Sequence, residues 1–84
     1  MDNSAALLLK CFDKLERQMS ADGAYSYNIM VSNDPQLSHL IASFDSLLHR
    51  ARHYVFIGLL KQAGRLMLAL QALSAKIAGI LASA

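Results

Sequence analysis

Apolar residues at helical spacing run through the second half of this chain, and this stripe constrains the fold more than any other feature. From Leu37 to Ile80 they recur in steps of three and four, which places them on one face of an α-helix. No proline follows Pro35, so the pattern predicts a helix over residues 35–82. At about 1.5 Å per residue, such a helix would be on the order of 70 Å long.

Two features inside this stretch favour a break as the alternative. Three successive steps of four, from Ala51 to Ala63, shift the phase of the stripe. Gly58 and Gly64 lie in the same region, and a glycine inside a helix costs about 1 kcal/mol relative to alanine. A kink or short turn between residues 57 and 65 would divide the long helix and give a three-helix arrangement.

A shorter amphipathic helix is predicted over residues 3–21. Its apolar positions recur at i, i+4, i+7 and i+11, and they are Leu8, Phe12, Leu15 and Met19. Asn3 or Ser4 can accept hydrogen bonds from the free N–H groups of the first turn, and Gly23 tolerates the left-handed conformation that ends many helices. The whole chain, residues 1–84, is therefore predicted to be one all-α domain, a helical hairpin of a short N-terminal helix and a long C-terminal helix.

A linker over residues 22–34 should connect the two helices. It ends at Asp34, where an Asx cap directly precedes a proline at the first helical position. Within the linker, every second residue from Tyr25 to Val31 is aromatic or aliphatic, as in a half-buried strand. The preferred interpretation is a connecting segment that packs on the helices, and the alternative is an edge strand contributed to a partner.

The apolar surface of the long helix exceeds what the short helix can cover. A chain of 84 residues buries only about 60% of the surface that its unfolded form exposes. One cysteine and no metal cluster are available to stabilise it, so we expect oligomerisation with another helical protein or with copies of itself. Leu70→Asp would bury a charge in the contact between the helices of this chain and its partner, so it should abolish assembly. The residues predicted to form the partner interface are Phe44, Leu48, Val55, Leu59, Leu66, Leu70, Leu73, Ile77 and Ile80.

No catalytic, cofactor-binding or metal-binding site is predicted from the sequence. His49 and His53 are four residues apart on one helix face, but no third ligand is near them and arginines lie beside them. Cys11 and the serines have no companion at the spacing that nucleophilic catalysis needs. Cys11 instead suits a small buried side chain in a reducing, cytoplasmic compartment. We therefore expect a non-enzymatic interaction protein.

The charge distribution bears on the choice of partner. The net charge is only +2, but residues 35–84 carry five bases against Asp45 alone. These bases are spread along the chain without stacking aromatics, so no nucleic acid partner is expected. Lys76 interrupts the apolar run near the C-terminus, so no conventional transmembrane span is expected. An amphipathic helix over residues 54–84 that lies on a membrane surface is the second-rank alternative.

Part of the pattern resembles the small helical-hairpin proteins of type III secretion systems. The resemblance covers about residues 4–60 and is carried by Asp34, Pro35, Gln36, Leu47, Leu48, Ala51, Tyr54 and Val55. Resemblance to the needle co-chaperone family implies a bacterial cytoplasmic protein that binds a helical-repeat partner and keeps the needle subunit monomeric. Resemblance to the needle or inner-rod subunits implies export and packing of the C-terminal helix into a filament. The first of these is the leading prediction of function.

Overall fold

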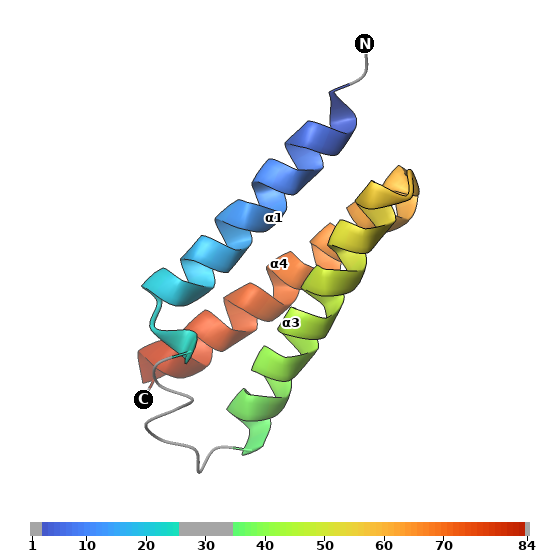
Figure 1. The fold of residues 1–84 in the computed structure, drawn as a ribbon. Helices are drawn as coiled ribbons and strands as arrows, with labels where there is room; N and C mark the ends of the chain where they lie inside the picture. Colours follow the sequence, from blue (N-terminus) through green and yellow to red (C-terminus); the bar gives the residue numbers. More distant parts are fainter. Residues whose placement is uncertain (1–2, 26–34, 84) are drawn as a thin grey trace.

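Three helices make up most of the residues that the computed structural model describes, which are 3–25 and 35–83. α1 spans Ser4–Ala21, α3 spans Pro35–Phe56 and α4 spans Leu60–Ser83. Figure 1 shows an elongated bundle, 46 × 18 × 17 Å, in which α1 and α4 run in one direction and α3 runs in the other. The all-α prediction is confirmed for the described residues, which contain no strand.

The single long helix predicted over residues 35–82 is wrong, because a tight turn divides it into α3 and α4. The Tyr54 carbonyl accepts a hydrogen bond from the Leu59 N–H group at 2.8 Å. The Val55 carbonyl accepts one from the Gly58 N–H group at 3.1 Å. Gly58 has φ +83°, so the two bonds form the left-handed helix ending for which glycine is favoured. The three-helix alternative, with its break near Gly58, is therefore confirmed.

The ends of α1 follow the sequence prediction in part. Asn3 precedes the helix as expected, but its side chain makes no capping hydrogen bond, and its carbonyl accepts from the Leu7 N–H group at 3.0 Å. The chain leaves the helix where predicted, with Gly23 at φ +76°. Tyr25, the first residue of the predicted half-buried strand, is helical. The rest of that predicted strand and the predicted Asx cap at Asp34 fall within residues 26–34, which lie outside the described residues.

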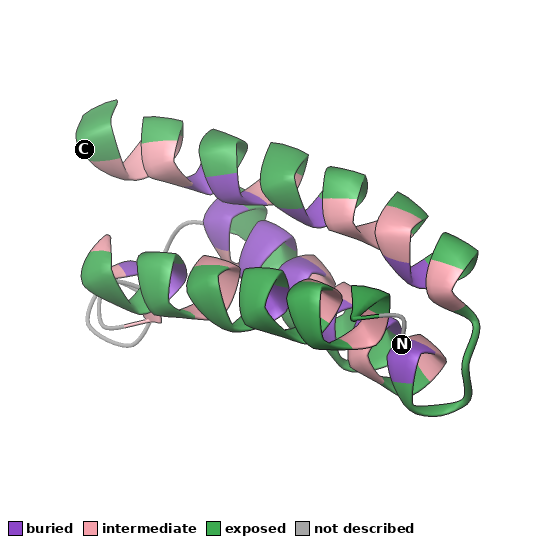
Figure 2. Cartoon of the chain, turned by 90° about the horizontal axis from the view of Figure 1, so that it is seen from above, coloured by how far each residue is buried: buried purple, intermediate pink, exposed green. Residues whose placement is uncertain are grey.

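α4 packs against both other helices, and this arrangement buries the apolar stripe inside the chain. Its contacts are most extensive with α3, and α1 and α3 contact each other least. Figure 2 shows the buried positions of the helices turned toward one another. The turn therefore lets one half of the stripe cover the other half, which a continuous helix could not do. The largest fully buried side chains are Phe12, Phe44, Met19, Leu37, Leu70 and Ile77.

The glycine of the turn allows a matched test of this break by urea denaturation. Gly58→Ala is expected to lower the free energy of unfolding by about 1–2 kcal/mol, because a side chain disfavours the left-handed backbone. Gly64→Ala, inside α4, should raise it by about 0.5–1 kcal/mol, because alanine favours the helix. A Cβ atom at either position meets nothing within 4 Å, so the contrast lies in the backbone. A gain of stability in Gly58→Ala would contradict the turn.

Candidate functional site

The nine side chains predicted to meet a partner lie mostly in the core of the bundle. Five are buried there: Phe44, Leu48, Val55, Leu70 and Ile77. Three are partly buried and pack against that core: Leu66, Leu73 and Ile80. Leu59, in the turn, is exposed. Contact with a partner at these positions stays a prediction, and for the buried ones it would require the helices to separate.

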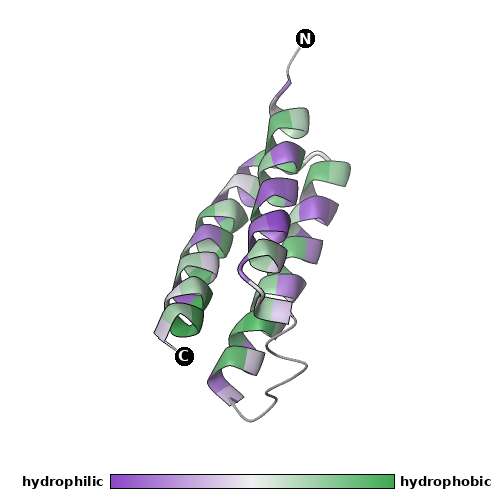
Figure 3. Cartoon of the chain, turned by 90° about the vertical axis from the view of Figure 1, so that its left-hand side faces the viewer, coloured by the Kyte–Doolittle hydropathy of each residue, from purple (hydrophilic) through white to green (hydrophobic). Residues whose placement is uncertain are grey.

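A shallow apolar groove lies between the first half of α1 and the start of α4, and it was not predicted from the sequence. It has a volume of about 530 Å³ and is lined by Ser4, Leu7, Leu8, Cys11, Leu60, Lys61 and Met67. Cys11 is exposed, which corrects its interpretation as a buried side chain. Figure 3 shows hydrophobic positions at the N-terminal end of α1 and hydrophilic ones in its middle.

One sequence signal could have indicated the groove. Residues 7–9 are three consecutive leucines, and successive residues of a helix point about 100° apart, so they cannot all face one core. Accordingly, Leu7 is 60% exposed and Leu9 is also exposed, while Leu8 is partly buried. Where α4 passes α1, however, is a tertiary property that the periodicity of α1 does not contain.

The outer face of α4 is a second exposed apolar surface. It presents exposed positions at alternating steps of four and three: Leu68, Ala72, Ala75, Gly79 and Ala82. Only 17% of the most apolar window of this helix is buried within the chain. By length and composition α4 could cross a membrane, a criterion that core helices of soluble proteins also meet. Lys76 therefore does not exclude a span, contrary to the expectation from the sequence.

Polar side chains join α1 and the residues just after it to α3. Arg52 donates hydrogen bonds to Asp13 at 2.7 Å and to Glu16 at 3.1 and 3.3 Å. The Tyr25 hydroxyl donates to Asp45 at 2.8 Å. A cleft of about 350 Å³ lies here, lined by Glu16, Tyr25, Asp45, Leu48, His49 and Arg52. Among the described residues, no group of three potential ligands could hold a metal ion.

The contacts in this cluster favour the protonated form of both donors still further. The hydrogen bond to Glu16 raises the pKa of Arg52, and burial together with the bond to Asp45 raises the pKa of Tyr25. Neither group is therefore prepared to act as a base near neutral pH. The Arg52 side chain is 33% exposed, so each ion pair stabilises the fold by only about 0–1 kcal/mol. The cluster therefore serves as a structural contact that links α1 to α3.

Comparisons with protein families, with curated proteins and with solved structures each found no match. The class of the protein therefore follows from its own architecture, a helical bundle in which the described helices α1, α3 and α4 pack together and leave an apolar groove between α1 and α4. Function must be argued from that groove and from the exposed faces around it.

Proposed function

We propose that this protein is a non-enzymatic binding protein that holds an apolar helix of another protein in the groove between α1 and α4. The groove itself carries the proposal, because leucine and methionine side chains line it while remaining open to water. Removing such apolar surface from water contributes roughly 25 cal/mol of favourable free energy per Å². In helix-in-groove recognition, apolar residues at i, i+3 or i+4 and i+7 of the bound helix fill a groove of this kind.

The edge of the groove favours one kind of helix. Lys61 lines it, and none of its lining residues is acidic. A bound helix with an acidic residue beside its apolar stripe would place that residue near the lysine. Such a pair contributes to the choice and orientation of the partner more than to affinity.

The leading specific form of the proposal is a needle co-chaperone of type III secretion in the bacterial cytoplasm. It depends on the resemblance carried by residues between Asp34 and Val55. In this role the groove would cover the apolar face through which needle subunits otherwise pack on one another. Leu7 and Met67 would then contact the needle subunit directly.

A filament subunit, exported and packed with copies of itself, is the second candidate, and the outer face of α4 favours it. Small side chains at alternating steps of four and three let a second helix approach closely along that face. Contacts between copies that do not close into a ring produce rods or filaments. In this case Leu68 would lie in the seam between subunits.

Light scattering separates these two candidates. A groove-binding protein should be a monomer alone and form a small complex of fixed stoichiometry when it is co-expressed with its partner from a neighbouring gene. Leu7→Lys is expected to lose that complex, whereas Leu68→Lys, at a similarly exposed position of α4, should keep it. Polymers of the isolated chain that Leu68→Lys but not Leu7→Lys prevents would favour the filament. A chain that stays monomeric in both measurements contradicts both candidates.

A further inference from the structure

The α3–α4 turn concentrates exposed apolar side chains in one short segment. Phe56 is 87% exposed, Ile57 49% and Leu59 40%, and these are three of the six exposed large hydrophobic side chains of the described residues. The turn lies at one end of the bundle, the same end at which α1 begins (Figure 1). Backbone hydrogen bonds and Gly58 hold its shape, so the apolar side chains are not needed to form the turn.

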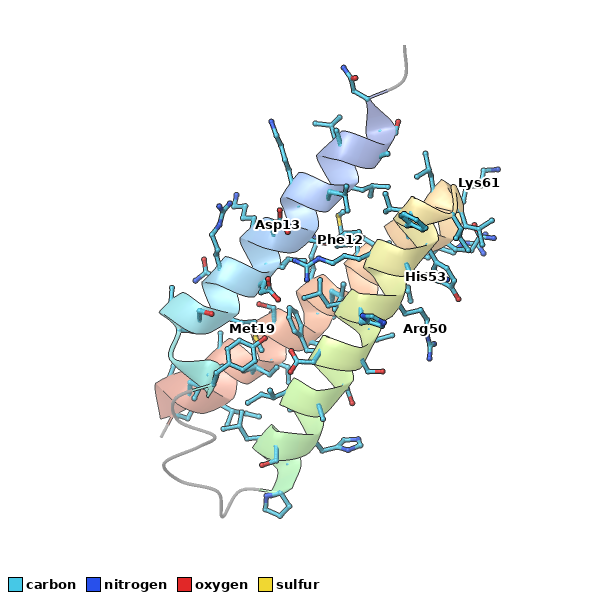
Figure 4. The ribbon with its side chains drawn as sticks, in the orientation of Figure 1. Phe12, Asp13, Met19, Arg50, His53 and Lys61 are labelled. Atoms are coloured by element: carbon cyan, nitrogen blue, oxygen red, sulfur yellow. The ribbon has the colours of Figure 1, made fainter. Side chains whose placement is uncertain are left out.

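Basic side chains flank this turn on both helices. Figure 4 shows His53 near the end of α3, Arg50 about one turn earlier on that helix, and Lys61 at the start of α4, where it also lines the groove beside α1. Arg65 is exposed one turn further along α4. No acidic residue occurs between residue 46 and the end of the chain. We call the exposed apolar side chains of Phe56, Ile57 and Leu59 the apolar tip. We call the basic residues near it the collar: Arg50, His53, Lys61 and Arg65.

The acidic residues in the described part of the chain do not neutralise this collar. Every acid in the described part of the chain accepts a hydrogen bond from another side chain: Asp13, Glu16, Asp22 and Asp45. Among the described bases, Arg52 alone forms an ion pair, with two of these acids. The positive charge around the apolar tip is therefore free to attract an anionic surface.

We propose that the apolar tip docks on an anionic lipid membrane, with Phe56 and Ile57 inserted at the level of the headgroups and the collar bases against lipid phosphates. Interfacial binding combines these two elements, apolar burial and attraction to anionic lipid. The tip lies at one end of the bundle, where a deformable surface can contact its exposed side chains and the bases beside them. This proposal goes beyond helix binding in the groove and does not depend on it.

A tryptophan at the tip tests insertion, because the chain has no tryptophan of its own. Phe56→Trp is mixed with vesicles of phosphatidylcholine and phosphatidylserine, and separately with vesicles of phosphatidylcholine alone. We expect its fluorescence to shift to the blue, and to be quenched by brominated acyl chains, only with the anionic vesicles. Leu68→Trp, at an exposed position of the outer face of α4, is the matched control and should not change.

Charge variants in the Phe56→Trp background test the collar. Lys61→Glu combined with Arg65→Glu should weaken vesicle binding by at least about 25-fold, because each base near an anionic surface contributes about fivefold. Added salt should also weaken vesicle binding, because it screens the attraction between the bases and the lipid phosphates. No blue shift of Phe56→Trp with anionic vesicles would overturn the proposal. An equal blue shift of the Leu68→Trp fluorescence would overturn it too, since the face of α4 would then be the inserted surface. An equal blue shift of Phe56→Trp with neutral vesicles would contradict the role of the bases.

Discussion

Replacing Leu70 with aspartate is expected to unfold this protein at neutral pH. Leu70 is completely buried in α4, and the only polar residue among the buried side chains of the described chain is Ser74. An ionised carboxylate there would have no basic partner, and burying an unpaired charge costs several kcal/mol even after the surroundings relax, on the order of 3–5 kcal/mol. The lost burial of the leucine side chain adds about 2–5 kcal/mol. A chain of 84 residues has a total stability of roughly 4–13 kcal/mol, so the two costs together would remove most of it.

Leu68→Asp is the matched control for this substitution. Leu68 lies two residues away on the opposite side of the same helix and is 68% exposed, so the change should cost less than about 0.5 kcal/mol. Circular dichroism and thermal melting compare the two variants with the wild type. A Leu70→Asp protein that melts as the wild type does would show that this residue is not in the core.

The expected unfolding changes how Leu70→Asp can be used to study a partner. The sequence alone suggested that this variant would abolish assembly by placing a charge in a seam between chains. Because Leu70 is buried within its own chain, a loss of binding would instead report a loss of fold. Substitution of the exposed Leu7 in the groove is therefore the informative test of partner binding.

Phe12→Ala is expected to lower the free energy of unfolding by about 3–5 kcal/mol, through lost apolar burial and the cavity left behind. Phe12 is one of the two side chains of α1 that are buried in the core, the other being Met19. The melting temperature should fall by at least about 12 °C, since 1 kcal/mol corresponds to about 4–8 °C in a domain of this size. The residual bundle would be held mainly by the contacts between α3 and α4.

Phe56→Ala provides the control with the same change of side chain. Phe56 is exposed in the turn, and its removal should alter the free energy of unfolding by less than about 0.5 kcal/mol. Denaturation in urea and heat, monitored by the helical signal, measures both variants. If Phe12→Ala costs no more than Phe56→Ala, α1 is not anchored in the core as described.

Much of the helical architecture was predictable because local signals agreed with one another. The apolar positions of α1 included Phe12 and Met19, both of which are buried, and the helix ends just before Gly23 as the sequence indicates. α3 begins at Pro35, the position expected for a proline in a first helical turn. These features depend on residues close together in the chain, so periodicity and turn chemistry suffice to predict them.

The break and the groove were less predictable, for different reasons. The phase shift and Gly58 marked the region of the break, but a kink and a full reversal have the same local signature. Reversal is favoured because it lets the stripe of α4 cover the stripe of α3, and this gain depends on residues far apart in sequence. The groove then follows from the path of α4 past α1, which is why Leu7 and Cys11 became surface residues beside it.

By itself, the sequence determined that the chain is helical, which side of each helix is apolar, and that the bases gather after Asp45. The tertiary structure decided which apolar faces cover one another, so the stripe expected to meet a partner became largely the core of this chain. The physical reason is that apolar burial is favourable but has no direction, so periodicity shows that a face must be covered without showing by what. Folding α4 back along α3 covered that face from within and left the groove, the outer face of α4 and the apolar tip as apolar surfaces available to other molecules.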